Sequence, residues 1–163
     1  MKMLHPTLCL DMASHLGKDQ LARWGVRGLI LDIDNTLTSS DNPIPNPEAL
    51  SWVEDMKIAG IKMVILSNNH LARVSKFAEL LGLDYIAKAC KPLTGGFKRA
   101  CEKLDIPKEE IAVVGDQIFT DIFGGNRAGC VTILVDSLFD AEEWYIKIKR
   151  VLELPFKKPK YKK

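Results

Sequence analysis

The 163-residue sequence has few cysteines, no long apolar run and little net charge, and each scarcity excludes a class of protein. Its four cysteines, Cys9, Cys90, Cys101 and Cys130, are scattered, without the close spacing of a zinc site or a redox motif. No apolar run approaches the roughly 20 residues of a membrane span. The short apolar start is interrupted too early for a signal peptide. These absences predict a cytoplasmic protein with reduced thiols.

Basic residues are distributed unevenly along the chain. The formal net charge is only +2, yet five lysines lie within residues 157–163. The rest of the sequence carries 18 of the 23 basic residues against 21 acidic ones, so we expect no nucleic-acid-binding face. We predict a single domain over 1–155 and a basic, disordered tail over 156–163. Such a tail is attracted to anionic membranes, which suggests peripheral contact with the inner face of the membrane.

Apolar, strand-like runs alternate with helix-like stretches along the chain. Strands are predicted at 26–33, 61–66, 85–87, 111–114 and 131–135. Helices are predicted at 47–59, 70–81, 93–104, 118–128 and 140–153. This alternation predicts an α/β fold, a Rossmann-like doubly wound parallel sheet of about five strands with helices on both faces. Residues 1–25 receive no role beyond packing.

Polar residues collect where the predicted strands end. They are Asp32 and Asp34, then Ser67 and Asn68, then Lys91, and finally Asp116 and Asp121. In parallel sheets ligands bind beyond the carboxyl ends of the strands, so these side chains should share one rim. Two desolvated carboxylates one residue apart repel each other, which indicates a divalent cation at the first pair. The alternative for that pair is simple capping of a turn or helix.

The chemistry that suits such a rim is phosphoryl transfer. Carboxylates hold Mg²⁺ together with water and phosphate oxygens. Ser67 and Asn68, at the start of a helix, would receive an anion, and Lys91 would neutralise a phosphoryl group. One carboxylate can act as the nucleophile, and a second can protonate the leaving oxygen and then activate water.

Four motifs in this order resemble those of the haloacid dehalogenase (HAD) superfamily. Asp32-Ile33-Asp34-Asn35-Thr36 resembles its Asp-x-Asp-x-Thr motif, and Ser67-Asn68-Asn69 resembles the second motif. Lys91-Pro92 is similar to the third, and Gly115-Asp116-x-x-x-Thr120-Asp121 to the fourth. The resemblance implies a HAD-like fold and Mg²⁺-dependent hydrolysis of a phosphomonoester through an aspartyl phosphate.

The resemblance also implies a role for each carboxylate. Asp32 would be the nucleophile and a Mg²⁺ ligand. Asp34 would be the general acid and base, with its backbone carbonyl on the metal, and its presence favours phosphatases over dehalogenases. Asp116 would bind Mg²⁺ directly, and Asp121 would support the metal through water or an indirect contact.

The remaining motif residues would bind phosphate or support the loops. Ser67 and the backbone of Asn68 would hold phosphoryl oxygens. Lys91 would offset the charge of nucleophile and phosphate. Thr36 and Gly115 would support their loops.

The spacing of the motifs leaves no room for an inserted cap domain. A site without a cap should be open and suited to a bulky substrate, or closed by a partner. The short length and the glutamine in Gly115-Asp116-Gln117 are similar to subfamily IIIA, in particular its YqeG-type branch, which includes phosphatidylglycerophosphate phosphatases. That branch implies a phospholipid phosphate as substrate.

Other functions stay open on the sequence alone. The enzyme could act instead on a sugar, nucleotide or nucleic-acid phosphate. A signalling receiver also surrounds a phosphorylated aspartate with acidic residues, a hydroxyl and a lysine, but its nucleophile follows a strand in mid-chain. A binding or assembly protein could use the same fold without catalysis. The sequence does not indicate an oligomeric state.

Overall fold

A parallel sheet of six strands organises residues 2–136, the part of the chain that the computed structural model describes. The strands are β1 (Leu8–Leu10), β2 (Gly28–Leu31), β3 (Lys62–Leu66), β4 (Asp84–Ile86), β5 (Ile111–Gly115) and β6 (Val131–Val135). Their order in the sheet is β1-β6-β5-β2-β3-β4, and every neighbouring pair is parallel. The predicted helix at 140–153 and the tail at 156–163 lie outside the described residues.

The sheet has one strand more than the five predicted from the sequence. The additional strand, β1, is an edge strand of three residues that pairs with β6, with Leu8 opposite Ile133. A run of three residues is too short to show the alternation of apolar and polar residues that predicts a strand. Its pairing partner also lies more than 120 residues later in the sequence. The N-terminal segment therefore does more than pack, because Leu8–Leu10 add an edge strand to the described sheet.

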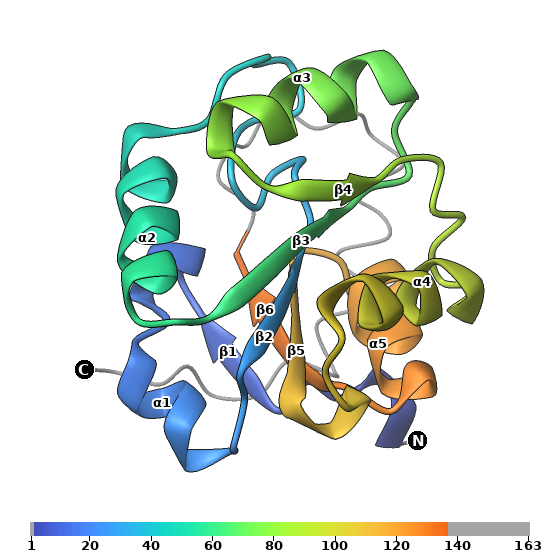
Figure 1. The fold of residues 1–163 in the computed structure, drawn as a ribbon. Helices are drawn as coiled ribbons and strands as arrows, with labels where there is room; N and C mark the ends of the chain where they lie inside the picture. The colour runs from blue at the N-terminus through green and yellow to red at the C-terminus, as the bar shows by residue number, and fades with distance from the viewer. Residues whose placement is uncertain (1, 137–163) are drawn as a thin grey trace.

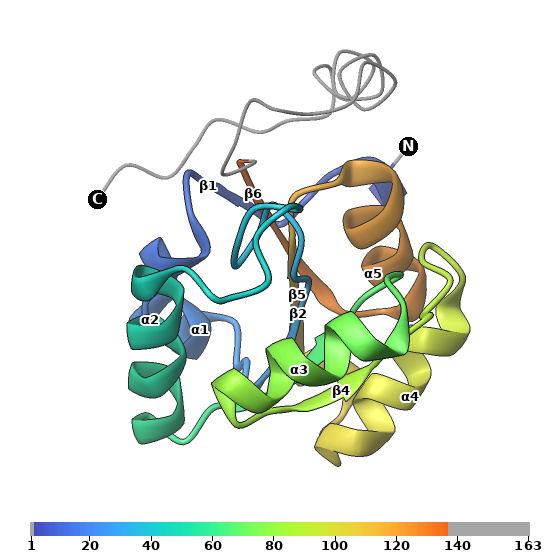
Figure 2. The ribbon, with the colours of Figure 1, turned by 90° about the horizontal axis from the view of Figure 1, so that it is seen from above.

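Both faces of the sheet are covered by helices (Figures 1 and 2). The helices are α1 (Lys18–Arg23), α2 (Pro47–Ile58), α3 (Leu71–Leu81), α4 (Thr94–Leu104) and α5 (Phe123–Ala128). Side chains of β2 alternate between the two layers: Leu29 and Leu31 join the core that contains α1, α2 and α3, whereas Ile30 joins the core of α4. All three are buried, as expected for a parallel sheet between two helical layers.

Local sequence signals explain where the helices begin and end. The side chain of Asn46 accepts a hydrogen bond from the amide of Glu48 at 2.8 Å, and Pro47 occupies the first position of α2. Helix α3 ends at Leu81 and is capped by Gly82, whose φ of 59° is left-handed. The helix predicted at 118–128 is in fact two segments, a π-helix at Ile118–Ile122 followed by α5.

The order of the strands reverses around β2. The chain proceeds from β2 through β3 to β4 on one side, whereas β5, β6 and β1 lie on the other. Between β2 and β3 the chain forms one loop and α2, and between β3 and α4 it forms α3 and β4, so these described segments contain no inserted cap domain. Within residues 2–136, no helix is both long and apolar enough to cross a bilayer.

Candidate active site

The first carboxylate of the site is placed by the strand that precedes it. Asp32 follows β2 directly, and its backbone amide donates to the carbonyl of Val114 on β5 at 3.0 Å. The chain then turns tightly through Asn35, whose φ is 60°. The result is that Asp32 lies buried between the ends of two central strands, at the point where the strand order reverses.

Lys91 joins two of the predicted carboxylates. Its Nζ donates to an oxygen of Asp32 at 2.7 Å and to an oxygen of Asp121 at 2.6 Å, and only 4% of the lysine side chain is exposed. Burial opposes the charged form of the lysine, but the two carboxylates outweigh burial and raise the pKa of Lys91 above its ordinary value. Lys91 is therefore a fixed positive charge in the site.

Three buried carboxylates converge here, so their combined negative charge is larger than the single positive charge of Lys91. Asp32, Asp116 and Asp121 each offer an oxygen within 4.8 Å of the others. Burial raises the pKa of Asp32 from 3.8 to about 7, although the charge of Lys91 acts to lower it. Oxygen ligands without histidine or cysteine suit a hard divalent cation, and the excess negative charge suits its sign. The described residues therefore fit a metal ion.

Gly115 allows the fourth motif to fold back on itself. A Cβ at this position would meet Cγ of Asp121 at 2.4 Å, so only glycine leaves room for that carboxylate. The second oxygen of Asp121 accepts hydrogen bonds from the amide of Gln117 at 3.2 Å and the hydroxyl of Thr120 at 3.4 Å. The spacing of the motif thus positions Asp121 against Lys91.

The second motif follows β3 and connects the end of this strand to the loop that carries Lys91. Ser67 is buried, and its Oγ accepts a hydrogen bond from the amide of Asn69 at 3.1 Å. The side chain of Asn68 binds the backbone of Lys91 twice, accepting from its amide at 2.6 Å and donating to its carbonyl at 3.1 Å. This use of the Asn68 side chain could not be seen in the sequence, which suggested a role only for its backbone.

Asp34 lies beside this cluster and has partners of its own. Asn69 Nδ2 donates to Asp34 Oδ2 at 3.2 Å, and the guanidinium of Arg73 on α3 donates to Asp34 Oδ1. Sequence reasoning gave no role to either partner. Asn69 was at least part of a motif, whereas nothing in the sequence singles out Arg73. Thr36 is buried in the same turn, but its hydroxyl makes no hydrogen bond within the described residues.

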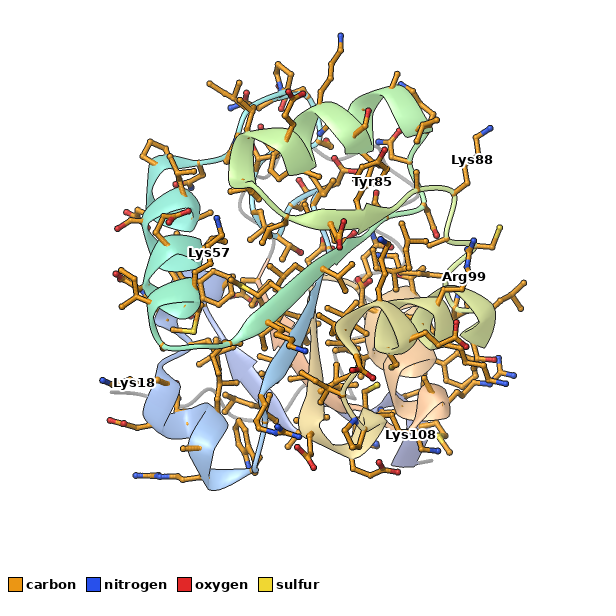
Figure 3. The ribbon with its side chains drawn as sticks, in the orientation of Figure 1. Lys18, Lys57, Tyr85, Lys88, Arg99 and Lys108 are labelled. Carbon is orange, nitrogen blue, oxygen red and sulfur yellow. The ribbon has the colours of Figure 1, made fainter. Side chains whose placement is uncertain are left out.

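These side chains line a cavity of about 330 Å³ at the carboxyl ends of the strands. Its lining residues are Asp32, Asp34, Ser67, Asn68, Asn69, Lys91, Gln117 and Thr120. A larger hollow of about 810 Å³ lies beside α2 and the start of β3, where Figure 3 labels Lys57. In this larger hollow, Lys57 and Lys62 donate to backbone carbonyls at the ends of α3 and α4. The predicted site residues line the smaller cavity instead, so we place the chemistry there.

Most residues predicted for the site are brought together. Asp32, Ser67, Lys91, Asp116 and Asp121 are all buried, and contacts and the shared cavity place them near one another. A doubly wound parallel sheet that gathers carboxylates, a hydroxyl and a lysine at its reversal point defines a class, the α/β enzymes that handle phosphate groups.

Comparison with known proteins identifies the family. The model of the haloacid dehalogenase-like hydrolases matches residues 39–129. The probable phosphatase YqeG of Bacillus subtilis is 41% identical over 139 residues, which cover 85% of this chain and 81% of that protein. The chloroplastic/mitochondrial phosphatidylglycerophosphate phosphatase 1 of Arabidopsis thaliana is 31% identical over 86% of this chain and 43% of its own length. The chain belongs to the haloacid dehalogenase-like hydrolase family, and it is a phosphatase.

Solved structures share the fold. An uncharacterized protein from Listeria monocytogenes superimposes with a TM-score of 0.58 and 24% identity, covering 72% of this chain and 85% of that one. The deoxy-D-mannose-octulosonate 8-phosphate phosphatase of Haemophilus influenzae, determined in a cobalt-bound form, gives 0.56 and 15% identity, covering 77% and 75%. At these identities the likeness concerns the fold alone, and it agrees with the doubly wound sheet predicted from the sequence.

Proposed function

We propose that this phosphatase hydrolyses a phosphomonoester with Mg²⁺ through a phosphorylated Asp32. The observation that carries the proposal is the contact of Asp32 with Lys91 inside a cluster of three carboxylates. A buried carboxylate beside a fixed cation can approach a phosphate dianion, which an isolated carboxylate would repel. Asp34 lies at the same cavity, where a proton could be exchanged with the leaving group.

The reaction would proceed in two displacements. An oxygen of Asp32 attacks phosphorus, the bond from phosphorus to the ester oxygen breaks, and Asp34 gives its proton to the departing alkoxide. Water then loses a proton to Asp34 and attacks phosphorus. The bond between phosphorus and Asp32 breaks, which releases inorganic phosphate and restores the carboxylate. Ser67, the backbone of Asn68 and Lys91 would hold the phosphoryl oxygens in both steps.

Mg²⁺ would be held by the carboxylates of Asp32 and Asp116 and by the backbone carbonyl of Asp34, with Asp121 as a supporting group. When bound, the ion would neutralise negative charge on the phosphoryl oxygens and on these carboxylates. Asp121 accepts its hydrogen bonds from Lys91, Gln117 and Thr120, and these contacts suit a group that acts on the metal indirectly.

We propose phosphatidylglycerophosphate as the substrate, which places the enzyme in phospholipid biosynthesis. Support comes from the relative of that name, which is 31% identical, and from the absence of a cap domain between the described motifs. A site without a cap can take a phosphate that protrudes from a bulky, insoluble molecule.

The enzymatic test is metal-dependent phosphate release. Wild-type protein should hydrolyse p-nitrophenyl phosphate with Mg²⁺ and lose this activity in EDTA, and Asp32→Asn should abolish it. Asp55→Asn, an exposed change on α2, is the matched control and should keep full activity. Wild-type protein without turnover on any phosphomonoester would contradict the proposal.

The substrate is tested by competition between classes of phosphate. Phosphatidylglycerophosphate in detergent micelles should give a kcat/KM well above those for glycerol 3-phosphate, sugar phosphates and nucleotides. If a soluble phosphate is preferred, the lipid assignment is wrong while the phosphatase mechanism stands.

A further inference from the structure

Arg73 forms an ion pair with Asp34, the proposed general acid and base. It occupies the third position of α3, and its side chain is only 15% exposed. Two of its nitrogens, Nη2 at 2.5 Å and Nε at 3.2 Å, donate to the same oxygen, Oδ1 of Asp34. Because both bonds end on one oxygen, they fix the position of Oδ1, and a donor on the other oxygen is needed to restrict the rotation of the carboxylate.

The other oxygen of Asp34 has a different partner. Asn69 Nδ2 donates to Oδ2 at 3.2 Å, so each carboxylate oxygen has a fixed donor from the region around the start of α3. Asp34 is 25% exposed and lines the cavity, so it remains accessible to substrate. By contrast, Lys91 contacts Asp32 and Asp121. The two cations of the site therefore serve different carboxylates.

Arg73 also binds the loop that leads from β2 to α2. Its Nη2 donates to the carbonyl of Asn42 at 3.2 Å and to that of Ser39 at 3.4 Å. One guanidinium thus joins three segments: the turn that carries Asp34, the loop between β2 and α2, and the first turn of α3.

We propose that Arg73 is a positioning residue that holds Asp34 in place for proton transfer to the leaving group. The inference rests on the proposed role of Asp34 as general acid. It follows that loss of Arg73 should impair those reactions that need a proton on the leaving oxygen and spare those that do not.

Leaving groups of different basicity separate this role from a merely structural one. An alkoxide departing from glycerol 3-phosphate needs a proton, whereas p-nitrophenolate departs readily without one. The ratio kcat/KM reports the steps up to cleavage of the ester bond. Arg73→Met should lower kcat/KM for glycerol 3-phosphate by about a hundredfold and for p-nitrophenyl phosphate by no more than about fivefold.

Two further variants complete the comparison. Arg73→Lys keeps the positive charge but loses the second guanidinium nitrogen that contacts Asp34. It should give an intermediate loss, again larger on glycerol 3-phosphate than on p-nitrophenyl phosphate. Arg99→Met makes the same substitution on an exposed arginine of α4, labelled in Figure 3, and should leave both rates unchanged. Equal losses on both substrates in Arg73→Met, or no loss on glycerol 3-phosphate, would overturn the proposal.

Asp34→Asn, measured in parallel, separates this inference from the function on which it rests. If Asp34→Asn shows no selective loss on glycerol 3-phosphate, the role of Asp34 fails and that of Arg73 fails with it. If Asp34→Asn shows the selective loss and Arg73→Met does not, only the role of Arg73 is wrong. The double variant should lose no more on glycerol 3-phosphate than Asp34→Asn alone, because Arg73 acts through Asp34.

Discussion

At the scale of single residues, the site contains a conflict between burial and charge. Asp32 and Asp121 are both buried and form ion pairs with the same residue, Lys91, and Asp116 lies close to them. Packing alone would not favour three carboxylates at one point, since apolar side chains would fill the space with less desolvation. The arrangement therefore lowers the stability of the metal-free protein in return for a reactive site, and this can be measured.

Stability without metal should depend on pH through Asp32. Its pKa rises from 3.8 to about 7 on folding, so its contribution is full below about pH 4 and is lost as pH rises through 7. In EDTA, Asp32→Asn should be more stable than wild type at pH 8, by up to about 4 kcal/mol, and equally stable near pH 4. Denaturant unfolding across this range measures the difference. A difference that is constant with pH would contradict the prediction.

Gly115 offers a second test at this scale. In Gly115→Ala the new methyl group would collide with Asp121, move that carboxylate away from Lys91, and destabilise the fold by about 1–3 kcal/mol. Phosphatase activity should fall by about a hundredfold or more. Gly95→Ala is the control, because nothing lies within 4 Å of its added Cβ, and it should match wild type or be slightly more stable. Equal effects from both substitutions would show that the close approach at Gly115 does not matter.

At the scale of secondary structure, prediction succeeded where a segment was long and periodic. The predicted helices at 47–59, 70–81 and 93–104 match α2, α3 and α4 to within one residue at each end, because Gly60, Gly82 and Pro47 mark boundaries locally. Strand β1 and the π-helical turn at Ile118–Ile122 were not predicted. Strand β1 pairs with β6, and Ile118 and Ile122 pack against Cys9 and Leu134, so both segments have contacts with distant parts of the chain that no local pattern records.

In the site, too, some features could be predicted from the sequence and others could not. Carboxylates at strand ends could be found from their spacing, since parallel topology brings such positions together. Hydrogen bonds between side chains on different elements could not. The contacts of Asn68 with the Lys91 backbone and of Arg73 with Asp34 require the folded geometry of two loops. What sequence could not supply is the set of partners that orients the reactive groups.

Trp52 connects two elements and provides a test at this scale. It lies on α2, is 4% exposed, and its ring nitrogen donates to the carbonyl of Leu16 at 2.8 Å. Trp52→Phe should lower the free energy of unfolding by about 1–3 kcal/mol, and Trp52→Ala by about 3–5 kcal/mol. Trp24→Phe, at a partly exposed tryptophan, is the control and should have a smaller effect. A Trp52→Phe protein as stable as wild type would contradict a structural role for this hydrogen bond.

At the scale of the whole molecule, metal binding should act on global stability. An ion that binds only the folded state at 100 times its Kd adds about 2.7 kcal/mol, or about 5–10 °C in Tm for a protein of this size. Mg²⁺ should therefore raise the Tm of the wild type, and Asp116→Asn should abolish most of this rise. Asp55→Asn should respond like wild type. Thermal unfolding at several Mg²⁺ concentrations tests this, and an equal rise in Asp116→Asn would exclude Asp116 as a ligand.

The pairing of β1 with β6 sets an order of events during protein synthesis. Leu8 leaves the ribosome early, but its partner Ile133 is made 125 residues later. At about 5–20 residues per second, β1 waits roughly 6–25 s for the strand that it pairs with. Because β1 pairs with β6, the last of the described strands, nascent chains that stop before β6 leave β1 without this neighbour.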